Sequence, residues 1–280
     1  MDVMQYMTKD KNPEKTKIPG VSKIIIVSSG KGGVGKTTIA VHLALALHKE
    51  RMKVGIFDAD LHGPNIPLML GIRPKQSANI SIPFFRVDTT PYIPTLNCFG
   101  IKVISLGFAY NDRSAIIVDG FFSGRMARQT LCDIKWGKLD FLLVDLPPGT
   151  GEPQKTLINT MAIDGAIIVT TPHEFSFMDS SRGLKLLNDS GIEIFGVIEN
   201  MSSFICPNCG ASTDLFPQNK KPENYLTQEQ PLLGRIPMNY YFGCAINEKH
   251  PSVTENESIS EKKIFRDIAR NIIEKVHEKP

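Results

Sequence analysis

One stretch decides the fold of this chain: Ser29-Gly30-Lys31-Gly32-Gly33-Val34-Gly35-Lys36-Thr37-Thr38. It matches G-x-x-x-x-G-K-[ST], with an apolar run at 24–27 before it and a helical pattern after it, which is the context of a phosphate-binding loop. Glycines let backbone N–H groups turn towards a polyphosphate, and the helix N-terminus adds partial positive charge. Lys36 is expected to reach the β- and γ-phosphates, and the Thr37 hydroxyl to hold Mg²⁺. Residues 30–38 therefore predict an ATP site.

Short apolar runs bounded by turn residues follow the loop, at 54–57, 101–106, 141–144, 166–169, 194–198 and 232–236. Helical patterns fit between or beside them, at 37–50, 124–134, 154–163 and 176–188. Runs of this kind are typical of parallel strands that are covered on both faces. Counting 24–27, they predict a doubly wound α/β fold with a mostly parallel sheet of about seven strands and helices on both faces.

The pattern predicts one ATPase domain at 21–280 after a flexible polar tail at 1–20. A metal-binding insertion is expected at about 201–220, and an amphipathic helix that packs onto the sheet at 261–277. His42 and His48 are expected on the outer surface of the helix at 37–50.

Composition limits the partners and the compartment. The net charge of the 280 residues is only +3, which gives no reason to expect nucleic acid or an anionic membrane surface. No apolar run approaches the roughly 20 residues that span a bilayer, and the N-terminus has no apolar signal region. The five cysteines are an odd number and thinly spread, which argues against a disulfide framework. We therefore expect a cytoplasmic protein.

Aspartates stand at the ends of two predicted strands, where ligands collect in such folds. Asp145 is predicted to order Mg²⁺ and its waters near the γ-phosphate, and Asp58 to support the water shell of the metal. Asp60 is predicted to orient the attacking water, since it lies further along a loop that can move. The alternative for any one of these aspartates is a helix cap or a turn.

Other residues after the strands are candidates for responding to the nucleotide. Gly149 and Gly151 give the loop after Asp145 the freedom of a switch segment. Asn200 could read the adenine edge, and Arg235 and Pro237 could flank the ring. A polar residue at a strand end is nevertheless a common feature.

The second informative site is Cys206-Pro207-Asn208-Cys209-Gly210. Such a knuckle aims two thiolates at one ion, whereas Zn²⁺ or an iron–sulfur cluster needs four ligands. The other cysteines, Cys98, Cys132 and Cys244, are isolated and expected to behave as small hydrophobes. The deficit suggests that two copies of the chain share a four-thiolate site across a two-fold axis. The alternatives are a redox pair, or a one-chain zinc site completed by Cys244 or a histidine.

Several motifs resemble known families. Residues 30–37 resemble the deviant Walker A motif of the MinD/ParA class of dimerising ATPases. Four further motifs, in the same order along about 22–255, resemble the Mrp/ApbC family of iron–sulfur cluster carrier ATPases: DADLHGPNIP at 58–67, DLPPGTG at 145–151, ENMS at 199–202 and CPNCG at 206–210.

The resemblance implies an ATP-binding homodimer that holds a labile [4Fe–4S] cluster between its subunits and passes it to apo-proteins. It implies Cys206 and Cys209 as the cluster ligands, and Zn²⁺ can replace the cluster in preparations made in air. The resemblance also implies the residues that bind nucleotide and Mg²⁺ and serve hydrolysis: Lys36, Thr37, Asp60 and Asp145. It implies that Asn200 contacts the adenine. The chain departs from the family at 117–121, where W-R-G-P is usual, and at 76–99, so target specificity stays open.

Lys31 lies inside the phosphate loop, five residues before Lys36. At the rim it could reach across a two-fold axis to the phosphates of the partner and stabilise transition-state charge, as an arginine finger does. The alternative is a solvated rim lysine. Lys31, Lys36 and Asp60 are thus the predicted catalytic residues.

A second class of function is a MinD/ParA-type positioning ATPase that acts on a membrane or on DNA. The C-terminal helix tests that hypothesis, because basic amphipathic ends bind lipid. Its basic residues are interleaved with acidic ones, which argues against strong lipid attraction. The CPNCG knuckle favours the cluster carrier, since a positioning ATPase has no use for it.

Overall fold

Each apolar run forms a strand, because its alternate side chains pack under helices on opposite faces of one sheet. Ile24 and Ile26 lie in one hydrophobic core, and Ile25 and Val27 lie in the other. With both faces covered, the strands are apolar at nearly every position. The structure is a computed structural model and describes residues 15–61, 63–72, 95–109, 120–215, 230–238 and 259–278.

The described strands are β1 (Val21–Ser28), β2 (Val54–Asp58), β3 (Leu96–Cys98), β4 (Ile101–Ser105), β5 (Leu139–Asp145), β6 (Gly165–Thr170), β7 (Ile194–Ile205), β8 (Ser212–Thr213) and β9 (Leu232–Met238). Their order is β3-β4-β2-β5-β1-β6-β7-β8, and β9 also pairs with β7. Among these strands, β3 pairs antiparallel with β4 and β8 pairs antiparallel with β7, and all the other pairs are parallel. The predicted, mostly parallel sheet is confirmed, and the two added strands are too short to have a detectable period.

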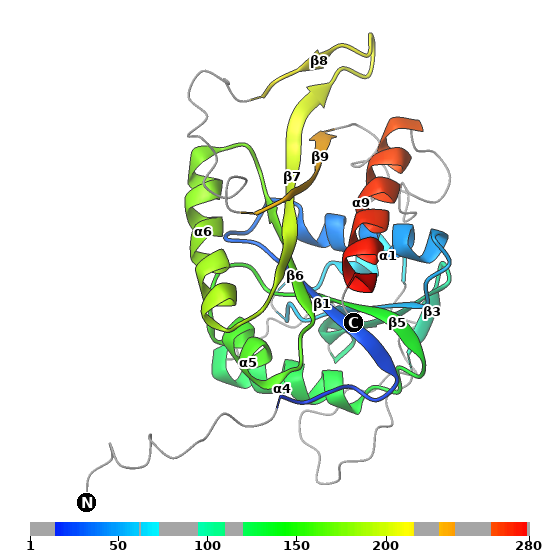
Figure 1. Ribbon diagram of the computed structural model, residues 1–280, viewed down its shortest axis with the longest axis vertical. Helices are drawn as coiled ribbons and strands as arrows, with labels where there is room; N and C mark the ends of the chain where they lie inside the picture. The colour runs from blue at the N-terminus through cyan, green and yellow to red at the C-terminus, as the bar shows by residue number, and fades with distance from the viewer. Residues whose placement is uncertain are drawn as a thin grey trace, which may run out of the picture.

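The described helices are α1 (Lys36–Lys49), α2 (Ile66–Met69), α4 (Gly120–Asp133), α5 (Glu152–Thr160), α6 (Glu174–Asp189) and α9 (Ile259–His277), with a 3₁₀ turn at Leu106–Ala109. The helices α1 and α9 cover one face of the sheet, and α4, α5 and α6 cover the other (Figure 1). Because β1 pairs with β5 and β6, the loop that follows β1 starts at the middle of the carboxyl edge of the sheet.

The prediction that His42 lies on the outer surface of α1 is wrong. Helix α9 packs along α1, so α1 is covered by the sheet on one side and by α9 on the other. His42 is 1% exposed, stacks on Phe265 of α9 at 5.2 Å, and its Nδ1 lies 2.7 Å from the Thr38 carbonyl oxygen. His48, nearer the end of α1, is half-buried. Helix α9 is amphipathic, as predicted, and its apolar side is buried. This side packs against α1 as well as against β9 of the sheet.

The described part of the predicted N-terminal tail is not loose. Residues 15–20 lie against the body, where Thr16 bridges to Met161 and Ile18 enters a hydrophobic core. The reason is that Ile18 is apolar and the Thr16 backbone pairs with Thr160 and Ala162. Residues 1–14 lie outside the described residues, as do 76–94 and 117–119 of the two divergent stretches.

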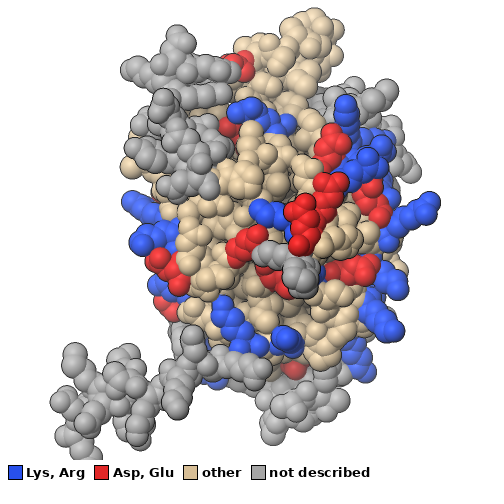
Figure 2. All heavy atoms as spheres, in the orientation of Figure 1, with Lys and Arg blue, Asp and Glu red and all other residues tan. Residues whose placement is uncertain are grey.

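Charged side chains of both signs are interspersed on the face shown in Figure 2. On α9, Arg266 and Arg270 both form ion pairs with Glu50, which follows α1. The basic residues of α9 are thus partly neutralised by the body of the protein. None of the helices that the structure describes is long and apolar enough to cross a membrane.

Candidate nucleotide and metal site

The phosphate loop joins β1 to α1, and its glycines set its shape. Gly33 and Gly35 have φ of 81° and 83°, a left-handed conformation that favours glycine. Gly35 is also the N-cap of α1 and has no side chain to cap the helix. The N–H groups of the first turn are therefore left for a bound anion, which the helix dipole also favours.

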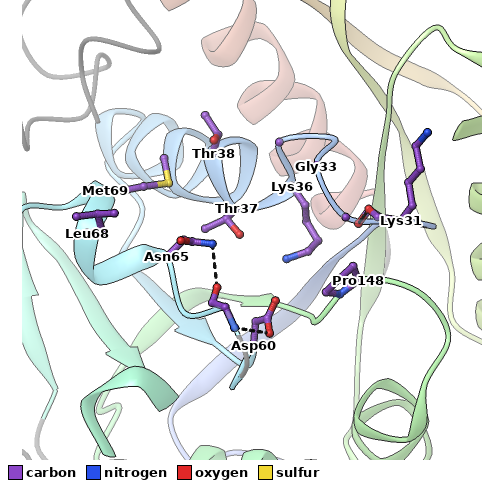
Figure 3. Close-up of a pocket in the computed structure, with 14 residues that line it drawn as sticks. Lys31, Gly33, Lys36, Thr37, Thr38, Asp60, Asn65, Leu68, Met69 and Pro148 are labelled. Atoms are coloured by element: carbon purple, nitrogen blue, oxygen red, sulfur yellow. Dashed lines mark hydrogen bonds between the residues drawn. The ribbon is translucent and has the colours of Figure 1, made fainter. Parts of the chain in front are cut away.

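A pocket of about 380 Å³ lies over this loop (Figure 3). That volume falls within the range of small-molecule sites, roughly 300–1,000 Å³. The residues that line it come from the phosphate loop, from the segment after β2 and from the segment after β5: Ser29, Lys31, Gly32, Gly33, Gly35, Lys36, Thr37, Thr38, Asp60, Gly63, Asn65, Leu68, Met69 and Pro148.

Asp145 ties together the two loop residues that were predicted to bind phosphate and metal. Lys36 Nζ lies 2.6 Å from Asp145 Oδ1, and the Thr37 hydroxyl donates to Asp145 Oδ2 at 2.6 Å. Both Lys36 and Asp145 are buried. Burial raises the pKa of Asp145, and the Lys36 charge acts in the opposite direction. The arrangement places the Lys36 amine and the Thr37 hydroxyl at the pocket and the Asp145 carboxylate, which does not line it, directly behind them.

Asp58 pairs in register with Asp145 across β2 and β5 and is fully buried. Its carboxyl accepts hydrogen bonds from the Ser105 hydroxyl at 2.9 Å and from the backbone N–H groups of Ile66 and Asp60 at 3.3 Å and 3.2 Å. Burial, and then the nearby Asp145, raise the pKa of Asp58 to about 8. Asp58 therefore anchors the loop that carries Asp60 to the neighbouring strand β4.

Asp60 lies at the pocket, where its side chain and that of Lys36 both point inward (Figure 3). Its Oδ1 accepts a hydrogen bond from the Gly63 N–H at 3.1 Å, which keeps the loop tight. Lys31 behaves differently. Its side chain points away from Lys36 and Asp60, towards the outside of the pocket (Figure 3).

Helix α6 flanks the phosphate loop. A Cβ on Gly30 would lie 2.1 Å from the Asp179 carbonyl carbon, so only glycine permits this approach. The first turns of α6 expose two large apolar side chains, Phe175 at 64% and Met178 at 56%. On the other side, the Gly149 N–H of the predicted switch segment donates to Ser29 at 3.1 Å. The loop is thus held between α6 and the segment after β5.

The three predicted adenine residues lie beside the phosphate loop or β7, outside the lining of the pocket. Asn200 Nδ2 donates to the Val34 carbonyl of the loop at 2.9 Å. Arg235 is exposed and its Nε lies 3.2 Å from Glu199 Oε1, while Pro237 is half-buried in β9. Conversely, Asn65, Leu68 and Met69 line the pocket, and the sequence predicts no role for them. Asn65 lies in the motif at 58–67, whereas Leu68 and Met69 lie in α2, which is too short to show a period.

The cysteine knuckle follows the end of β7, which with β8 projects beyond the sheet (Figure 1). Gly210 N–H donates to the Cys206 carbonyl and Cys206 N–H to the Ala211 carbonyl, both at 2.9 Å. Backbone N–H groups of Cys209 and Asn208 also donate to the Cys206 sulfur and lower the pKa of this thiol. Cys206 is half-buried and Cys209 exposed. The turn therefore favours a thiolate before any metal binds.

Other ligands do not gather at the knuckle within the described ranges. No group of three or more His, Cys, Asp or Glu side chains there is placed to hold a metal ion. Cys98 and Cys132 are half-buried against the cores, as expected, and burial raises the pKa of both thiols. Cys244, the candidate for completing a one-chain zinc site, lies outside the described residues.

A family model described as NUBPL iron-transfer P-loop NTPase, of the ParA group, matches residues 20–273. This chain belongs to that family. An iron–sulfur cluster carrier protein from Methanocaldococcus jannaschii is 41% identical over 259 residues, 91% of this chain and 85% of the relative. The protein of the same description from Escherichia coli K12 is 36% identical over 258 residues, 91% of this chain and 67% of the relative.

Solved structures agree with the family assignment. A nucleotide-binding protein from Archaeoglobus fulgidus, in complex with ADP, is 31% identical with a TM-score of 0.69 and covers 87% of this chain and 91% of its own. The cell division ATPase MinD from Pyrococcus furiosus, 24% identical with a TM-score of 0.62, covers 90% of this chain and 99% of its own. The second likeness concerns the fold alone. The chain is thus a P-loop NTPase with the MinD-like fold.

Proposed function

We propose that this chain binds and hydrolyses ATP, holds a [4Fe–4S] cluster between two copies of itself and transfers the cluster to apo-proteins. The observation that carries the proposal is the Cys206–Cys209 knuckle, a turn that presents two thiols and favours the thiolate of Cys206, on a P-loop NTPase. The names of the relatives, iron–sulfur cluster carrier proteins, support it. A chain that needs reduced thiols also fits a reducing, cytoplasmic compartment.

In the proposed nucleotide chemistry, the ammonium group of Lys36 moves from Asp145 to the β- and γ-phosphates. The Thr37 hydroxyl and Asp145 offer oxygen ligands, which are the ligands that Mg²⁺ prefers. When bound, Mg²⁺ would neutralise charge on the phosphates. Asp58 holds the segment that carries Asp60, and Asp60 orients the attacking water from its place at the pocket. Gly149 and Gly151 let the segment after β5 follow the γ-phosphate.

For the base, we propose Asn200 as the adenine contact, with Arg235 and Pro237 beside the ring. Asn200 sits close to the first turn of α1 through its bond to Val34. An asparagine amide has two N–H donors and one acceptor oxygen, so one N–H on Val34 leaves a donor and an acceptor for a base edge.

The proposed homodimer uses the face that carries the phosphate loop and α6. Exposed large apolar groups that cluster on a surface are typical of interaction sites, and Phe175 and Met178 lie beside the loop. Lys31 points out of its own pocket (Figure 3). In the proposed dimer it reaches the phosphates of the partner. A two-fold axis at this face would also let two knuckles, with Cys206 and Cys209 from each copy, supply four thiolates.

Anaerobic reconstitution with iron and sulfide tests the proposal. The wild type should acquire broad visible absorption, restore activity to an apo iron–sulfur enzyme, and lose both in Cys206→Ser/Cys209→Ser. The matched control is Cys132→Ser, which removes a thiol that is far from the knuckle and half-buried in a core. A colourless wild type, or a double variant that keeps the absorption, contradicts the proposal. Bound Zn²⁺ from an aerobic preparation does not, because Zn²⁺ accepts the same ligands.

The alternative of a positioning ATPase has weaker support. The MinD structures that resemble this chain are under 25% identical to it and share only its fold. An ATPase that acts on a membrane or on DNA also has no need of a cysteine knuckle. Co-sedimentation of a colourless protein with anionic liposomes in ATP would favour it.

A further inference from the structure

Strand β7 contacts the phosphate loop and also carries the cysteine knuckle. Asn200 of β7 is 8% exposed and its Nδ2 donates to the Val34 carbonyl at 2.9 Å. A Cβ on Gly35 would lie 2.3 Å from the same Nδ2, so the amide occupies the space that the glycine leaves. Cys206 follows six residues later, within roughly 20 Å at about 3.3 Å per residue. One strand thus links the two candidate sites in the same chain.

The link has a bend directly after Asn200. Met201 has φ of 55°, the left-handed region that non-glycine residues seldom adopt. The pairing of β7 with β9 also changes register here: Asn200 is opposite Ile236, but Phe204 is opposite Met238. Four steps along β7 therefore match two along β9. The strand bulges between the sheet and the knuckle.

The two sides of the bend are held differently. Before it, Glu199 is 1% exposed and pairs with Arg235 of β9 at 3.2 Å, while β6 pairs with β7 up to the same residue. After it, residues 201–205 are only half-buried and their described partners are in β8 and β9. The knuckle is therefore joined through the left-handed bend at Met201 to a buried part of β7 that pairs with β6. Asn200 is the last buried side chain before the bend.

We infer that Asn200 is a positioning residue that couples the phosphate loop to the cysteine knuckle of its own chain. Filling of the loop by a nucleotide shifts the Val34 carbonyl or the Asn200 amide, and the shift is passed through Met201 to the knuckle, changing the reactivity of Cys206. If nucleotide also changes the affinity of the knuckle for a metal, metal on the knuckle changes nucleotide affinity by the same factor, because linkage between two binding equilibria is reciprocal. The biological role of this coupling rests on the proposed function, but the coupling itself does not.

The test is the alkylation rate of Cys206 and Cys209 by iodoacetamide, read peptide by peptide by mass spectrometry. Metal-free full-length protein is compared without nucleotide, with saturating ADP, and with a non-hydrolysable ATP analogue. Light scattering selects the conditions under which the oligomeric state is the same. We expect the nucleotide to change the wild-type rate at Cys206 at least about fivefold, the lower end of the usual range of coupling.

The decisive variant is Asn200→Asp, which keeps the size of the side chain but removes the N–H donors to Val34. With nucleotide binding confirmed at saturation, its alkylation rate should not respond to nucleotide. Asn188→Asp, the same change at an exposed position of α6, should respond as the wild type does. If Asn200→Asp does not bind nucleotide, Met201→Gly takes its place: it frees the bend, leaves the Val34 contact, and should also abolish the response.

A nucleotide response that persists in the variant that binds nucleotide overturns the inference, and so does a wild type that shows no response. Cluster reconstitution of the wild type is measured in parallel. A wild type that binds a cluster but shows no response contradicts this coupling alone, whereas a wild type that responds but binds no cluster contradicts the proposed function alone.

Discussion

At the scale of single residues, the site is organised by buried carboxyl groups. Asp145 holds the amine of Lys36 and the hydroxyl of Thr37, and Asp58 holds the loop that carries Asp60. The motif predicts that these residues cooperate, because strand order brings the ends of β2 and β5 together. It does not predict that Asp58 uses its oxygens on backbone N–H groups, since these contacts depend on the path of the loop after β2.

Asp60→Ala should bind ATP with little change in affinity and hydrolyse it at least about 100-fold more slowly, because the attacking water loses its orienting carboxylate. Phosphate release and equilibrium nucleotide binding measure the two effects separately. Asp214→Ala, at an exposed position beyond β8, is the control. Normal turnover by Asp60→Ala would remove Asp60 from the catalytic machinery.

Lys31→Ala should lower the rate of ATP hydrolysis by about 100-fold or more, since charge supplied in trans is worth at least that much in related phosphoryl transfer. The reason for expecting action on the partner is the outward direction of the side chain. Lys155→Ala changes an exposed lysine of α5 and should not alter the rate. Unchanged turnover in Lys31→Ala would leave this residue as a solvated lysine at the rim.

At the scale of elements, the long apolar runs were predictable and the contacts between helices were not. Periodicity locates the central strands because both faces are covered, but α2, β3 and β8 are too short to show a period. His42 was misplaced for a related reason: the pattern of α1 shows one apolar face, and the cover of its other side by α9 comes from far along the chain.

The buried His42 should make α1 and α9 sensitive to acid. Burial lowers its pKa from 6.5 to about 4, with Lys49 acting in the same direction. Between these values the unfolded chain binds the proton and the folded chain does not, so stability falls as the pH is lowered through this window. From about pH 7.5 to about pH 5, His42 should account for a loss of about 2 kcal/mol.

Urea unfolding of the wild type and of His42→Gln at the two pH values isolates this contribution. The raised pKa of Asp58 has the opposite sign, because the folded state keeps that proton, and it is common to both proteins. The glutamine variant should lose less stability in acid than the wild type. Equal losses would mean that His42 accepts a proton in the folded state.

At the scale of the whole molecule, the proposed function depends on the nucleotide pocket, the exposed first turns of α6 and the cysteine knuckle together. The sequence predicts the pocket and the knuckle from local motifs. It does not predict the Asn200 contact with Val34, which joins residues 166 positions apart, or the exposure of Phe175 and Met178 beside the loop. Such contacts depend on how β7 and α6 pack, and no local pattern contains that information.

Phe175→Asp/Met178→Asp should prevent the proposed ATP-dependent dimer by placing like charges at its interface, while nucleotide still binds to each chain. Multi-angle light scattering with a non-hydrolysable ATP analogue gives the mass. Asn188→Asp, at the far end of α6, should dimerise as the wild type does. A double variant that still dimerises would place the interface elsewhere.

The most direct test of the central claim is the anaerobic native mass of the reconstituted protein. The account predicts one [4Fe–4S] cluster for every two chains, and a mass without cluster for Cys206→Ser/Cys209→Ser. A cluster retained on a single chain, or one that survives loss of both cysteines, would contradict the claim that two knuckles share it.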